Sequence, residues 1–385
     1  MKVLDKDIVY IYINDCIRWS GGVNILIQII NSLKGSKDIN FKIIYVKPSI
    51  LMNFLNSLRL ILRGGGYKNN KIIDEDLLDK FQQYVNENNL KLEILDYSFF
   101  KKNFKDVKIF PIMKINSSLK NKKTIGYIPD CQHLHLESFF LKRVIIYRNY
   151  QFRRIKKFCS DVYCTSQNVK EDLVKHYMFN PKNIQVTGFM PMRLESQEEK
   201  LEKVNEEFFL IANQLWQHKN HIYAIKAFNK FLDKTKDENT KLYCTGHMHD
   251  HRDGTYTDKI IKLIDELNLN DRIKFLGYLD RKEFIKYLVS CKALIQPTLF
   301  EGSPGGFSVA DAVAYGVPVL ISDIPMNHEV DVGEVKYFDV NNEDSLANLL
   351  IDDFEVSLDS RLNQSNILSE NAVKKMRRII KDLIV

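Results

Sequence analysis

Proline, glycine and long apolar runs are scarce in this sequence. Its 385 residues include 9 prolines and 16 glycines, which excludes a collagen-like or low-complexity chain. No apolar run approaches the roughly 20 residues that a membrane-spanning helix needs. Charged residues interrupt the start of the chain, MKVLDKDIVYIYIND. We therefore expect neither a membrane span nor a signal peptide.

Cysteines are few, and their spacing forms no pair of the Cys-x-x-Cys type. The six of them stand mostly among apolar neighbours. This excludes a small disulfide-stabilised scaffold and is typical of buried free thiols in a reducing compartment. We expect a cytoplasmic protein that can still contact the inner face of the cell membrane.

A large charge of one sign is absent from the chain as a whole but not from its halves. The net charge is +7, from 56 basic and 49 acidic side chains. Up to residue 190 the net charge is +14, and beyond it the net charge is −7. Because 385 residues exceed what one hydrophobic core usually organises, we expect two domains with different partners.

The apolar runs that are present alternate with amphipathic helical segments. Such alternation predicts parallel βαβ units and therefore an α/β protein with doubly wound sheets. The pattern occurs twice, on either side of the polar, charge-dense connector at about 190–205. We predict two Rossmann-like domains facing across a cleft, residues 1–190 and 191–365, and a basic amphipathic C-terminal helix over 366–385 that packs back on the first domain.

The stretch TLFEGSPGGFSVADAVAYGVPVLISDIPMNHE (298–329) carries the clearest chemistry. Gly305 and Gly306 precede a helix expected from about residue 308, a place where free backbone N–H groups favour an anion. Glu301 and Asp311 flank this turn, and carboxylates accept hydrogen bonds from vicinal sugar hydroxyls. A phosphate seat between two acceptors suits a sugar nucleotide. A plain strand–turn–helix with solvated acids is the alternative.

This stretch resembles the donor-binding signature of the GT-B, family-4-like retaining glycosyltransferases (glycosyl transferases group 1), E-G-x-G-x-P-x-x-E-A followed by a-x-G-x-P-V-i-x-S. Glu301-Gly302 and Gly316–Val319 match it directly. Nine residues rather than seven separate the acids, the second acid is Asp311, and Val309 stands at the usual position of that second acid. The resemblance implies that Glu301 binds the sugar and Asp311 the ribose, with amides near Gly305–Phe307 at the diphosphate.

Two further segments extend the resemblance. Ser20-Gly21-Gly22 resembles the glycine loop that faces the donor phosphates, although a bare βα turn reads the same way. Residues 213–220, NQLWQHKN, stand where the family has G-R-L-x-x-x-K-G. The resemblance assigns Asn213 and Gln214 to the donor and Lys219 to the diphosphate. Gln214 replaces the usual arginine, so Lys219 is expected to carry more charge, with His218 and His221 as possible helpers. A solvated lysine is the alternative.

Residues 128–135, IPDCQHLH, resemble the I-x-D-F-Q-H turn that lies under the transferred sugar in one subgroup of the family. The resemblance implies that Asp130 and His133 touch the sugar or the acceptor hydroxyl. A metal site at Cys131, His133 and His135 is the weaker interpretation, because no second ligand cluster with zinc spacing accompanies it. The metal-like string at 247–253 is expected to be a loop at the cleft rim, and Asp74-Glu75-Asp76 a solvated helix face. We predict no metal requirement.

The helix KRVIIYRNYQFRRIKKF (142–158) contains seven cations and no acid. One interpretation is a helix with an apolar stripe and a solvated basic face. The other is a surface that binds anionic lipid headgroups or a lipid-diphosphate acceptor. The run at 51–68, which ends in Gly64–Gly66, could support the second interpretation as an apolar flap. No nucleic-acid module is recognisable, so we predict no nucleic-acid partner.

We therefore expect a retaining glycosyltransferase of the hexosyltransferase type, active in bacterial surface polysaccharide or glycan synthesis. It would move a sugar from a nucleoside-diphosphate sugar to a hydroxyl of a glycan or lipid-linked acceptor, without a cofactor. Two alternatives remain open: a nucleotide-sugar epimerase on the same fold, and a catalytically silent sugar-nucleotide-binding subunit.

Overall fold

The computed structural model describes residues 8–49, 75–104, 107–116, 118–120, 122–193, 203–250, 254–352 and 358–384. The apolar run at 51–68 with its three glycines, Asp74, His251 and Asp253, and most of the expected connector lie outside these residues.

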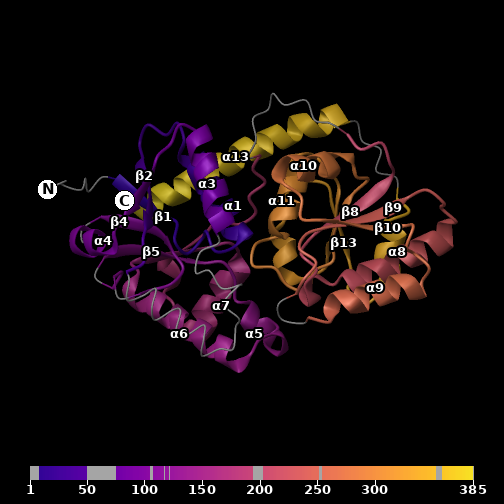
Figure 1. The fold of residues 1–385 in the computed structure, drawn as a ribbon, viewed down its shortest axis with the longest axis horizontal. Helices are drawn as coiled ribbons and strands as arrows, with labels where there is room; N and C mark the ends of the chain where they lie inside the picture. Colours follow the sequence, from indigo (N-terminus) through magenta and orange to yellow (C-terminus); the bar gives the residue numbers. More distant parts are fainter. Residues whose placement is uncertain are drawn as a thin grey trace.

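Two separate parallel sheets organise the chain (Figure 1). The first has seven strands in the order β3-β2-β1-β4-β5-β6-β7. They are β1 (Ile8–Tyr12), β2 (Asn40–Val46), β3 (Leu92–Leu95), β4 (Lys108–Ile112), β5 (Lys123–Ile128), β6 (Asp161–Cys164) and β7 (Ile184–Val186).

The second sheet has six strands in the order β10-β9-β8-β11-β12-β13. They are β8 (Phe208–Ala212), β9 (Lys241–Thr245), β10 (Ile273–Gly277), β11 (Leu294–Gln296), β12 (Val319–Ser322) and β13 (Val335–Phe338). Every strand pair in both sheets is parallel. The predicted class, α/β with two doubly wound Rossmann-like sheets, is confirmed.

Helices cover both faces of the first sheet, because successive side chains of a strand point to opposite faces. Ile11 of β1 packs towards α1 (Ser20–Leu33) and α3 (Glu75–Glu87). Tyr10, its neighbour in sequence, packs on the other face towards α4, α6 and α7. These last helices are α4 (Tyr97–Asn103), α6 (Lys142–Phe158) and α7 (Gln167–Tyr177), and the short α5 (Gln132–His135) precedes α6.

The second sheet is covered in the same way. Phe209 and Ile211 of β8 belong to one core with α8 (His221–Thr235), α9 (Tyr256–Glu266) and α12 (Glu343–Leu349). Phe208 and Leu210 belong to the opposite core with α10 (Arg281–Ser290) and α11 (Gly306–Ala314). Strands buried on both faces explain why the sequence shows continuous apolar runs here rather than alternation.

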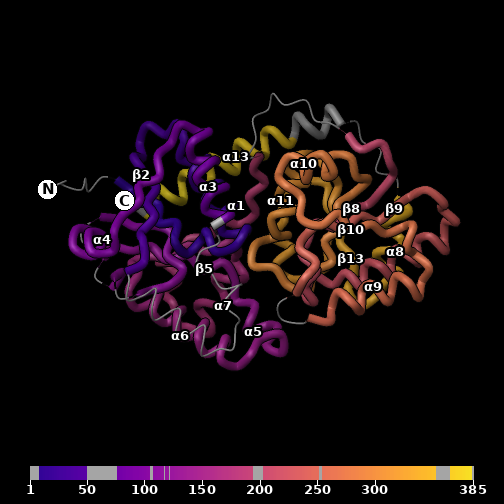
Figure 2. The backbone as a smooth tube through the Cα atoms, in the orientation of Figure 1, coloured from indigo at the N-terminus to yellow at the C-terminus, as the bar shows by residue number. Residues whose placement is uncertain are grey.

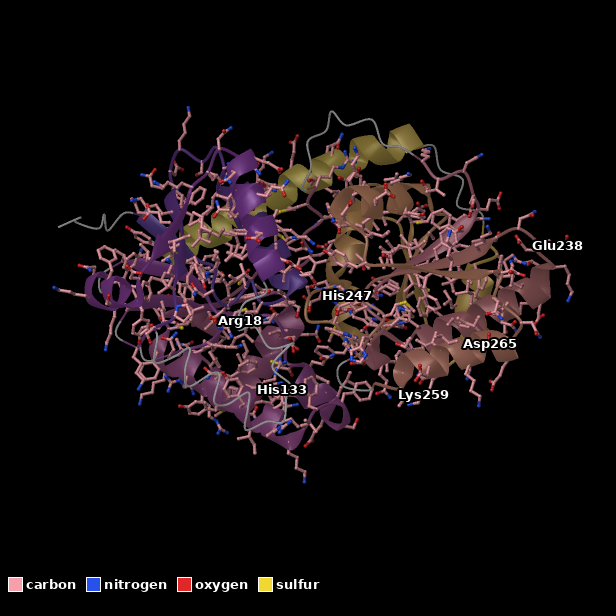
Figure 3. The ribbon with its side chains drawn as sticks, in the orientation of Figure 1. Arg18, His133, Glu238, His247, Lys259 and Asp265 are labelled. Carbon is pink, nitrogen blue, oxygen red and sulfur yellow. The ribbon has the colours of Figure 1, made fainter. Side chains whose placement is uncertain are left out.

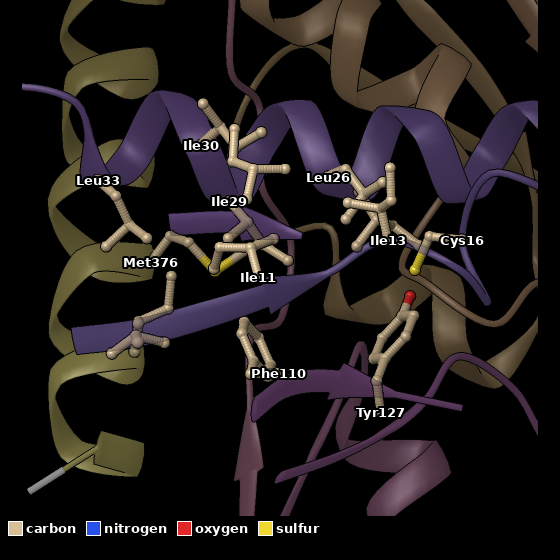
Figure 4. Packing of buried hydrophobic residues seen from close by; sticks show 14 of the residues in the cluster. Ile11, Ile13, Cys16, Leu26, Ile29, Ile30, Leu33, Phe110, Tyr127 and Met376 are labelled. Atoms are coloured by element: carbon tan, nitrogen blue, oxygen red, sulfur yellow. The ribbon is translucent and has the colours of Figure 1, made fainter. Parts of the chain in front are cut away.

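The last helix, α13 (Leu358–Ile384), runs from the second sheet to the first, where the chain ends (Figures 1 and 2). Its Met376 packs into the core formed by β1 and α1 (Figure 4). Arg377 fixes the crossing, because its Nε donates to the Ser32 carbonyl oxygen over 2.7 Å. The helix begins earlier than the expected residue 366. The domain limits themselves stay a prediction.

Candidate active site

A cavity of about 800 Å³ lies between the two sheets and is lined by both halves of the chain. This volume is within the range of small-molecule sites. Figure 3 marks His247 near the boundary between the halves, on the C-terminal side. Of the residues predicted for the site, the cavity wall includes Gly21, Asp130, Asn213, Gln214, Lys219, Glu301, Gly306 and Phe307.

The loop after β11 forms one end of this wall. Gly305 and Gly306 have φ values of +64° and +74°, a region that glycine enters without strain. A Cβ on Gly306 would lie 3.3 Å from the Glu301 carboxyl group, so the missing side chain makes room for that carboxylate. The loop is two residues longer than in the family signature, and α11 begins directly after it at Gly306.

The amide donors of this loop differ from the expectation. The N–H of Gly305 donates to Asn327 Oδ1 over 3.1 Å, and the N–H of Gly306 donates to the Ser303 carbonyl oxygen. Both groups are therefore used inside the loop. The next amides of the first turn belong to Phe307 and Ser308, which line the cavity. The first N–H groups of a helix have no intrahelical acceptor, so these two amides suit an anionic ligand.

Lys219 and Glu301 form an ion pair in the cavity wall. Their side chains are only 13% and 12% exposed. Lys219 ends a short 3₁₀ turn, and Asn220 in the left-handed region joins that turn to α8. The ammonium therefore stands outside the helix whose dipole would disfavour it. The structure brings together two residues that lie 82 positions apart in the sequence.

Gln296 at the end of β11 connects this pair to its surroundings, and the sequence analysis did not select it. Its Nε2 donates to the Gly305 carbonyl oxygen over 2.8 Å and to Glu301 Oε1 over 3.3 Å. Its Oε1 accepts a hydrogen bond from Asn213 Nδ2. A buried amide at the end of the apolar run ALIQPT was the signal that could have identified it.

Asp130, on the opposite side of the cavity, is paired with Arg148 of α6. Burial alone would raise the pKa of Asp130. The Arg148 guanidinium and the N–H of Gln132 outweigh burial and hold the pKa of this carboxyl below its usual range. Asp130 is therefore ionised at neutral pH and accepts hydrogen bonds.

His133 does not reach the cavity wall as the sequence analysis expected. The residue is 1% exposed, and its Nε2 lies 2.8 Å from the Tyr177 hydroxyl and 3.0 Å from Asn149 Oδ1. Burial, followed by the nearby Arg148, lowers the pKa of His133. Its place is taken at the wall by its neighbour Gln132. The helical turn of α5 points His133 into the core between α6 and α7.

Asp311 also lies away from the cavity wall. Its two carboxylate oxygens accept hydrogen bonds from Arg281 of α10, at 2.6 and 2.8 Å. The longer loop starts α11 at Gly306, which places Asp311 in its second turn, facing α10. The structure thus does not bring Asp311 next to Glu301, and Ser308 is the polar side chain of α11 that lines the cavity.

Gly21 and Gly22 at the start of α1 are needed for the local packing of the chain. A Cβ on Gly21 would lie 2.2 Å from the Trp19 ring, and one on Gly22 would lie 2.1 Å from the Cys16 carbonyl oxygen. Both glycines permit a close turn that places Trp19 over the helix start. Gly21 and Trp19 line the cavity, whereas Gly22 does not.

The two halves also meet at Gly302. The hydroxyl of Thr165 lies 2.7 Å from the Gly302 carbonyl oxygen and 2.8 Å from that of Pro129, so it can donate its proton to either. Nearby, Glu329 accepts hydrogen bonds from the backbone N–H groups of Gln167 and Asn168, at the start of α7. A carboxylate is favourable at a helix N-terminus, so this contact helps to hold the halves together.

We expect the Gly302→Ala variant to be less active by about tenfold. A methyl group here would lie 2.3 Å from the Pro129 carbonyl oxygen and 2.7 Å from Asp130 Cβ. Relieving such an overlap costs about 1–3 kcal/mol and would separate the two walls of the cavity. Turnover of a nucleotide sugar measures the effect. Gly254→Ala is the matched control, since nothing lies within 4 Å of its added Cβ. Equal activity of the two variants would contradict the predicted role of this contact.

The residues that resembled metal ligands are arranged otherwise. Among the residues that the structure describes, no group of three or more His, Cys, Asp or Glu side chains could hold a metal ion. His135 pairs with Asp172, and the His247 ring stacks on Tyr278 with centroids 4.8 Å apart at the cavity. Asp76 lines the cavity as well, although we expected only a solvated helix face.

The cysteines are free thiols, five of them buried and Cys159 half-buried. Burial raises the pKa of Cys159 to about 11 and the pKa values of Cys164 and Cys244 to about 12. Thiols with such pKa values carry little thiolate at neutral pH and make poor nucleophiles.

His221, suggested as a helper of Lys219, is fully buried and is not part of the cavity wall. Burial, followed by the Lys219 ammonium, lowers the pKa of His221 to about 3. In the unfolded chain the ring binds a proton near pH 6.5, so the unfolded state holds more protons between these values. Stability therefore falls as the pH is lowered from 7 towards 3.

We expect His221→Gln to flatten the acid dependence of the melting temperature. At pH 5 protonation of the unfolded chain at His221 costs the folded protein about 2 kcal/mol, and glutamine removes this term. Melting curves between pH 7 and 5 measure the slope for both proteins. His176→Gln, at an exposed position of α7, should keep the original slope. A His221→Gln slope equal to that of the parent would contradict this account.

Within the part of the chain that the structure describes, no helix has the length and apolar character needed to cross a membrane.

Comparison with known proteins finds a family that matches the C-terminal half of the chain. Residues 192–375 match the family model described as glycosyl transferases group 1. The O-antigen chain mannosyltransferase RfbU of Salmonella typhimurium is 26% identical over 218 residues, 57% of each chain. The N-acetylgalactosamine-N,N'-diacetylbacillosaminyl-diphospho-undecaprenol 4-alpha-N-acetylgalactosaminyltransferase of Campylobacter jejuni is 28% identical over 184 residues, 46% of each chain. The chain spans about half the length of these curated relatives.

Solved structures extend the likeness to the whole chain at the level of the fold. Anabaena Alr3699/HepE, in complex with UDP and glucose, superposes with a TM-score of 0.65 at 13% identity, over 98% of this chain and 99% of that chain. The lipopolysaccharide outer core galactosyltransferase WaaB superposes with a TM-score of 0.54 at 14% identity, over 97% and 99%. Residues 192–375, just under half of the chain, thus match the glycosyl transferases group 1 family, and the whole chain shares the GT-B-like fold of these solved structures.

Proposed function

We propose that this protein is a retaining glycosyltransferase that moves a sugar from a nucleoside-diphosphate sugar to an acceptor hydroxyl. The observation that carries the proposal is the Lys219–Glu301 pair in the wall of a cavity between two sheets, beside the glycine turn that starts α11. A cation, a carboxylate and the first amides of a helix together suit the charged diphosphate and the hydroxyls of a sugar nucleotide.

The donor would be held by the C-terminal wall. In this proposal Glu301 accepts hydrogen bonds from the sugar hydroxyls. Lys219 turns from Glu301 to the diphosphate when the donor binds, joined by the amides of Phe307 and Ser308. Asn213 and Gln214 complete the wall around the donor. These donors face charge that grows as the diphosphate departs, which is the most effective use of electrostatic stabilisation.

The transfer itself exchanges one glycosidic bond for another. The bond between the anomeric carbon and the diphosphate oxygen breaks, and its electron pair leaves with the diphosphate. The acceptor oxygen bonds to the anomeric carbon on the same face, which retains configuration. The hydroxyl proton passes to the departing phosphate. Asp130, ionised and on the opposite wall, accepts a hydrogen bond from the acceptor or the transferred sugar.

The proposal gives each half its own substrate. Residues 1–190 would hold a glycan or lipid-linked acceptor, residues 191–365 the donor, and residues 366–385 would pack back on the acceptor half. The contrast of +14 and −7 in net charge agrees with such a division. The printed activities of the Salmonella and Campylobacter relatives suggest bacterial surface polysaccharide or glycan synthesis as the setting.

A thermal-shift screen of nucleoside diphosphates and their sugars tests the donor site. A ligand at 100 times its Kd adds about 2.7 kcal/mol to the stability of the protein, which raises its melting temperature by several degrees. The screen is followed by product analysis with candidate acceptors. Transfer supports the proposal. Binding without turnover identifies a silent subunit, release of free sugar or epimer identifies an epimerase, and no stabilisation by any nucleotide overturns the donor site.

The outer face of α6 supports a further part of the proposal, contact with an anionic membrane at the cytoplasmic side. Apolar side chains here face the solvent, with Ile146 69% and Leu141 60% exposed. Helix α6 contains no acidic residue. Its exposed cations are Lys142, Arg143, Arg153, Lys156 and Lys157. Each such cation near an anionic bilayer contributes about 1 kcal/mol.

We expect the protein to co-sediment with vesicles containing phosphatidylglycerol and to remain in the supernatant with pure phosphatidylcholine. Ile146→Glu should weaken binding severalfold, because it places an anion at the centre of the apolar face. Ile367→Glu on α13 is the matched control, at a position 61% exposed. Equal sedimentation with both lipids would refute an anionic membrane as the partner of α6.

A further inference from the structure

Two cations on the N-terminal wall of the cavity have no task in the donor scheme. Lys114 follows β4, Arg148 lies in α6, and both line the cavity. Arg148 donates to the carbonyl oxygen of Asp130 over 3.0 Å and to its carboxylate, but its Nε is buried without a hydrogen-bond partner among the described residues. Lys114 Nζ makes no hydrogen bond or ion pair to any residue in the described ranges. This wall therefore holds donors that its own side chains leave unused.

The acids near these cations are already occupied. Asp15 accepts the backbone N–H groups of Met113 and Lys114, at 3.2 and 3.1 Å, and Asp130 is engaged by Arg148. Arg18 adds a third cation close to Asp15 and Lys114, and Figure 3 marks it on the N-terminal side of the boundary. Three cations thus stand against two acids. Arg18 is exposed, but Lys114 and Arg148 are half-buried in the cavity wall, so an anion bound between them would be stabilised by both charges.

The direction of the pKa of Lys114 agrees with the larger number of cations than acids near it. Burial lowers the pKa of Lys114, and Arg18 and Arg148 lower it further, while Asp15 opposes them. A bound anion would reverse this direction, because it would stabilise the ammonium form.

The surroundings of the cations describe the rest of the ligand. The Arg148 guanidinium lies over the rings of Phe140 and Phe152, 5.7 and 5.8 Å from their centroids. Tyr147 lines the cavity and is also 49% exposed, so it marks the rim. Beside it on α6 stands the exposed apolar side chain of Ile146. A path thus leads from the cations over apolar side chains to the outer face of α6.

We propose that Lys114 and Arg148 form a subsite for the phosphate group of a lipid-linked acceptor. The phosphate would lie between the two cations, with the lipid chain leaving past Tyr147 along α6 and the acceptor sugar directed towards Asp130 and the donor. This inference rests on the proposed function and specifies its acceptor. The subsite is distinct from the donor diphosphate site at Lys219, which lies on the opposite wall.

Farnesyl diphosphate is a suitable probe, compared with farnesol and with inorganic diphosphate in a calorimetric titration. We expect farnesyl diphosphate to bind at least tenfold more tightly than either comparison ligand. We also expect it to bind when a nucleoside diphosphate is present at a saturating concentration. Inorganic diphosphate binding as well as farnesyl diphosphate would overturn the lipid assignment. Displacement of farnesyl diphosphate by the nucleotide would assign the probe to the donor site and overturn the subsite.

Substitutions separate this proposal from the donor site. Lys114→Gln should lower the affinity for farnesyl diphosphate at least tenfold, because the substitution removes one charge-assisted contact. Arg148→Lys keeps the positive charge beside Asp130, so its affinity for farnesyl diphosphate should fall by less. Lys182→Gln, at an exposed position of the same half, is the control. An unchanged nucleotide-induced thermal shift shows that the variants are folded. Unaltered binding of the probe by Lys114→Gln refutes the subsite, whereas failure of nucleotides to bind refutes only the donor assignment.

Discussion

The Lys219→Ala variant is expected to lose about a hundredfold in kcat. Lys219 is the cation of the donor wall, and its usual arginine companion is replaced by Gln214. Removing a group that stabilises developing negative charge typically costs a hundredfold to a thousandfold. The loss appears in kcat rather than in KM alone, because the diphosphate charge grows in the transition state. Steady-state turnover of the donor identified by the thermal-shift screen measures it.

Two variants control this experiment. Lys219→Arg keeps a cation at the site and should recover part of the activity. Lys226→Ala removes the same charge from an exposed position of α8 and should leave kcat within twofold. Wild-type turnover by Lys219→Ala would remove Lys219 from the leaving-group site.

Glu301→Gln is expected to reduce kcat/KM by about a hundredfold, and its effect should not add to that of Lys219→Ala. The two side chains are paired and together nearly buried. Glutamine keeps the shape of Glu301 but leaves the Lys219 ammonium without its partner and the donor hydroxyls without a strong acceptor. Losing a charge-assisted hydrogen bond costs about 1.5–3 kcal/mol, and a hundredfold loss in kcat/KM corresponds to about 2.7 kcal/mol.

A double-mutant cycle measures the coupling of the pair. Residues in one hydrogen-bonded network typically couple by about 0.5–3 kcal/mol. The kcat/KM of the doubly substituted enzyme should therefore be close to that of the less active single variant. Glu283→Gln on α10, whose side chain is 46% exposed, is a control for the loss of one negative charge. Strict additivity of the two losses would show that Lys219 and Glu301 are not coupled and would contradict this prediction.

The sheets were largely predictable because parallel strands buried on both faces leave continuous apolar runs. The runs at 8–13, 41–46 and 208–213 each gave a strand of the structure. Strands β3, β7 and β13 lie at sheet edges and have no continuous apolar run of this length. Edge strands are less buried, as the half-exposed β13 shows, and therefore carry polar residues that weaken the apolar signal.

The site was predictable only in part, because spacing along a chain does not fix where a side chain points. Asp130, Lys219 and Glu301 were selected on motif resemblance, and all three line the cavity. Asp311 and His133 were selected on the same basis, and both point elsewhere, to Arg281 and to Tyr177. The starts of α11 at Gly306 and of α5 at Gln132 set the directions of these side chains, and spacing along the chain does not reveal them.

The sequence by itself determined the fold class, the family likeness and the division of charge, since each depends on local pattern and composition. The tertiary structure alone decided which groups face one another. It paired Lys219 with Glu301 and Asp130 with Arg148, placed Gln296 beside Glu301, and left Lys114 Nζ without a hydrogen bond among the described residues. These contacts join residues far apart in the chain, and hydrogen bonds and charge interactions act over a few ångströms of space. Only the packing of two sheets against each other sets those distances.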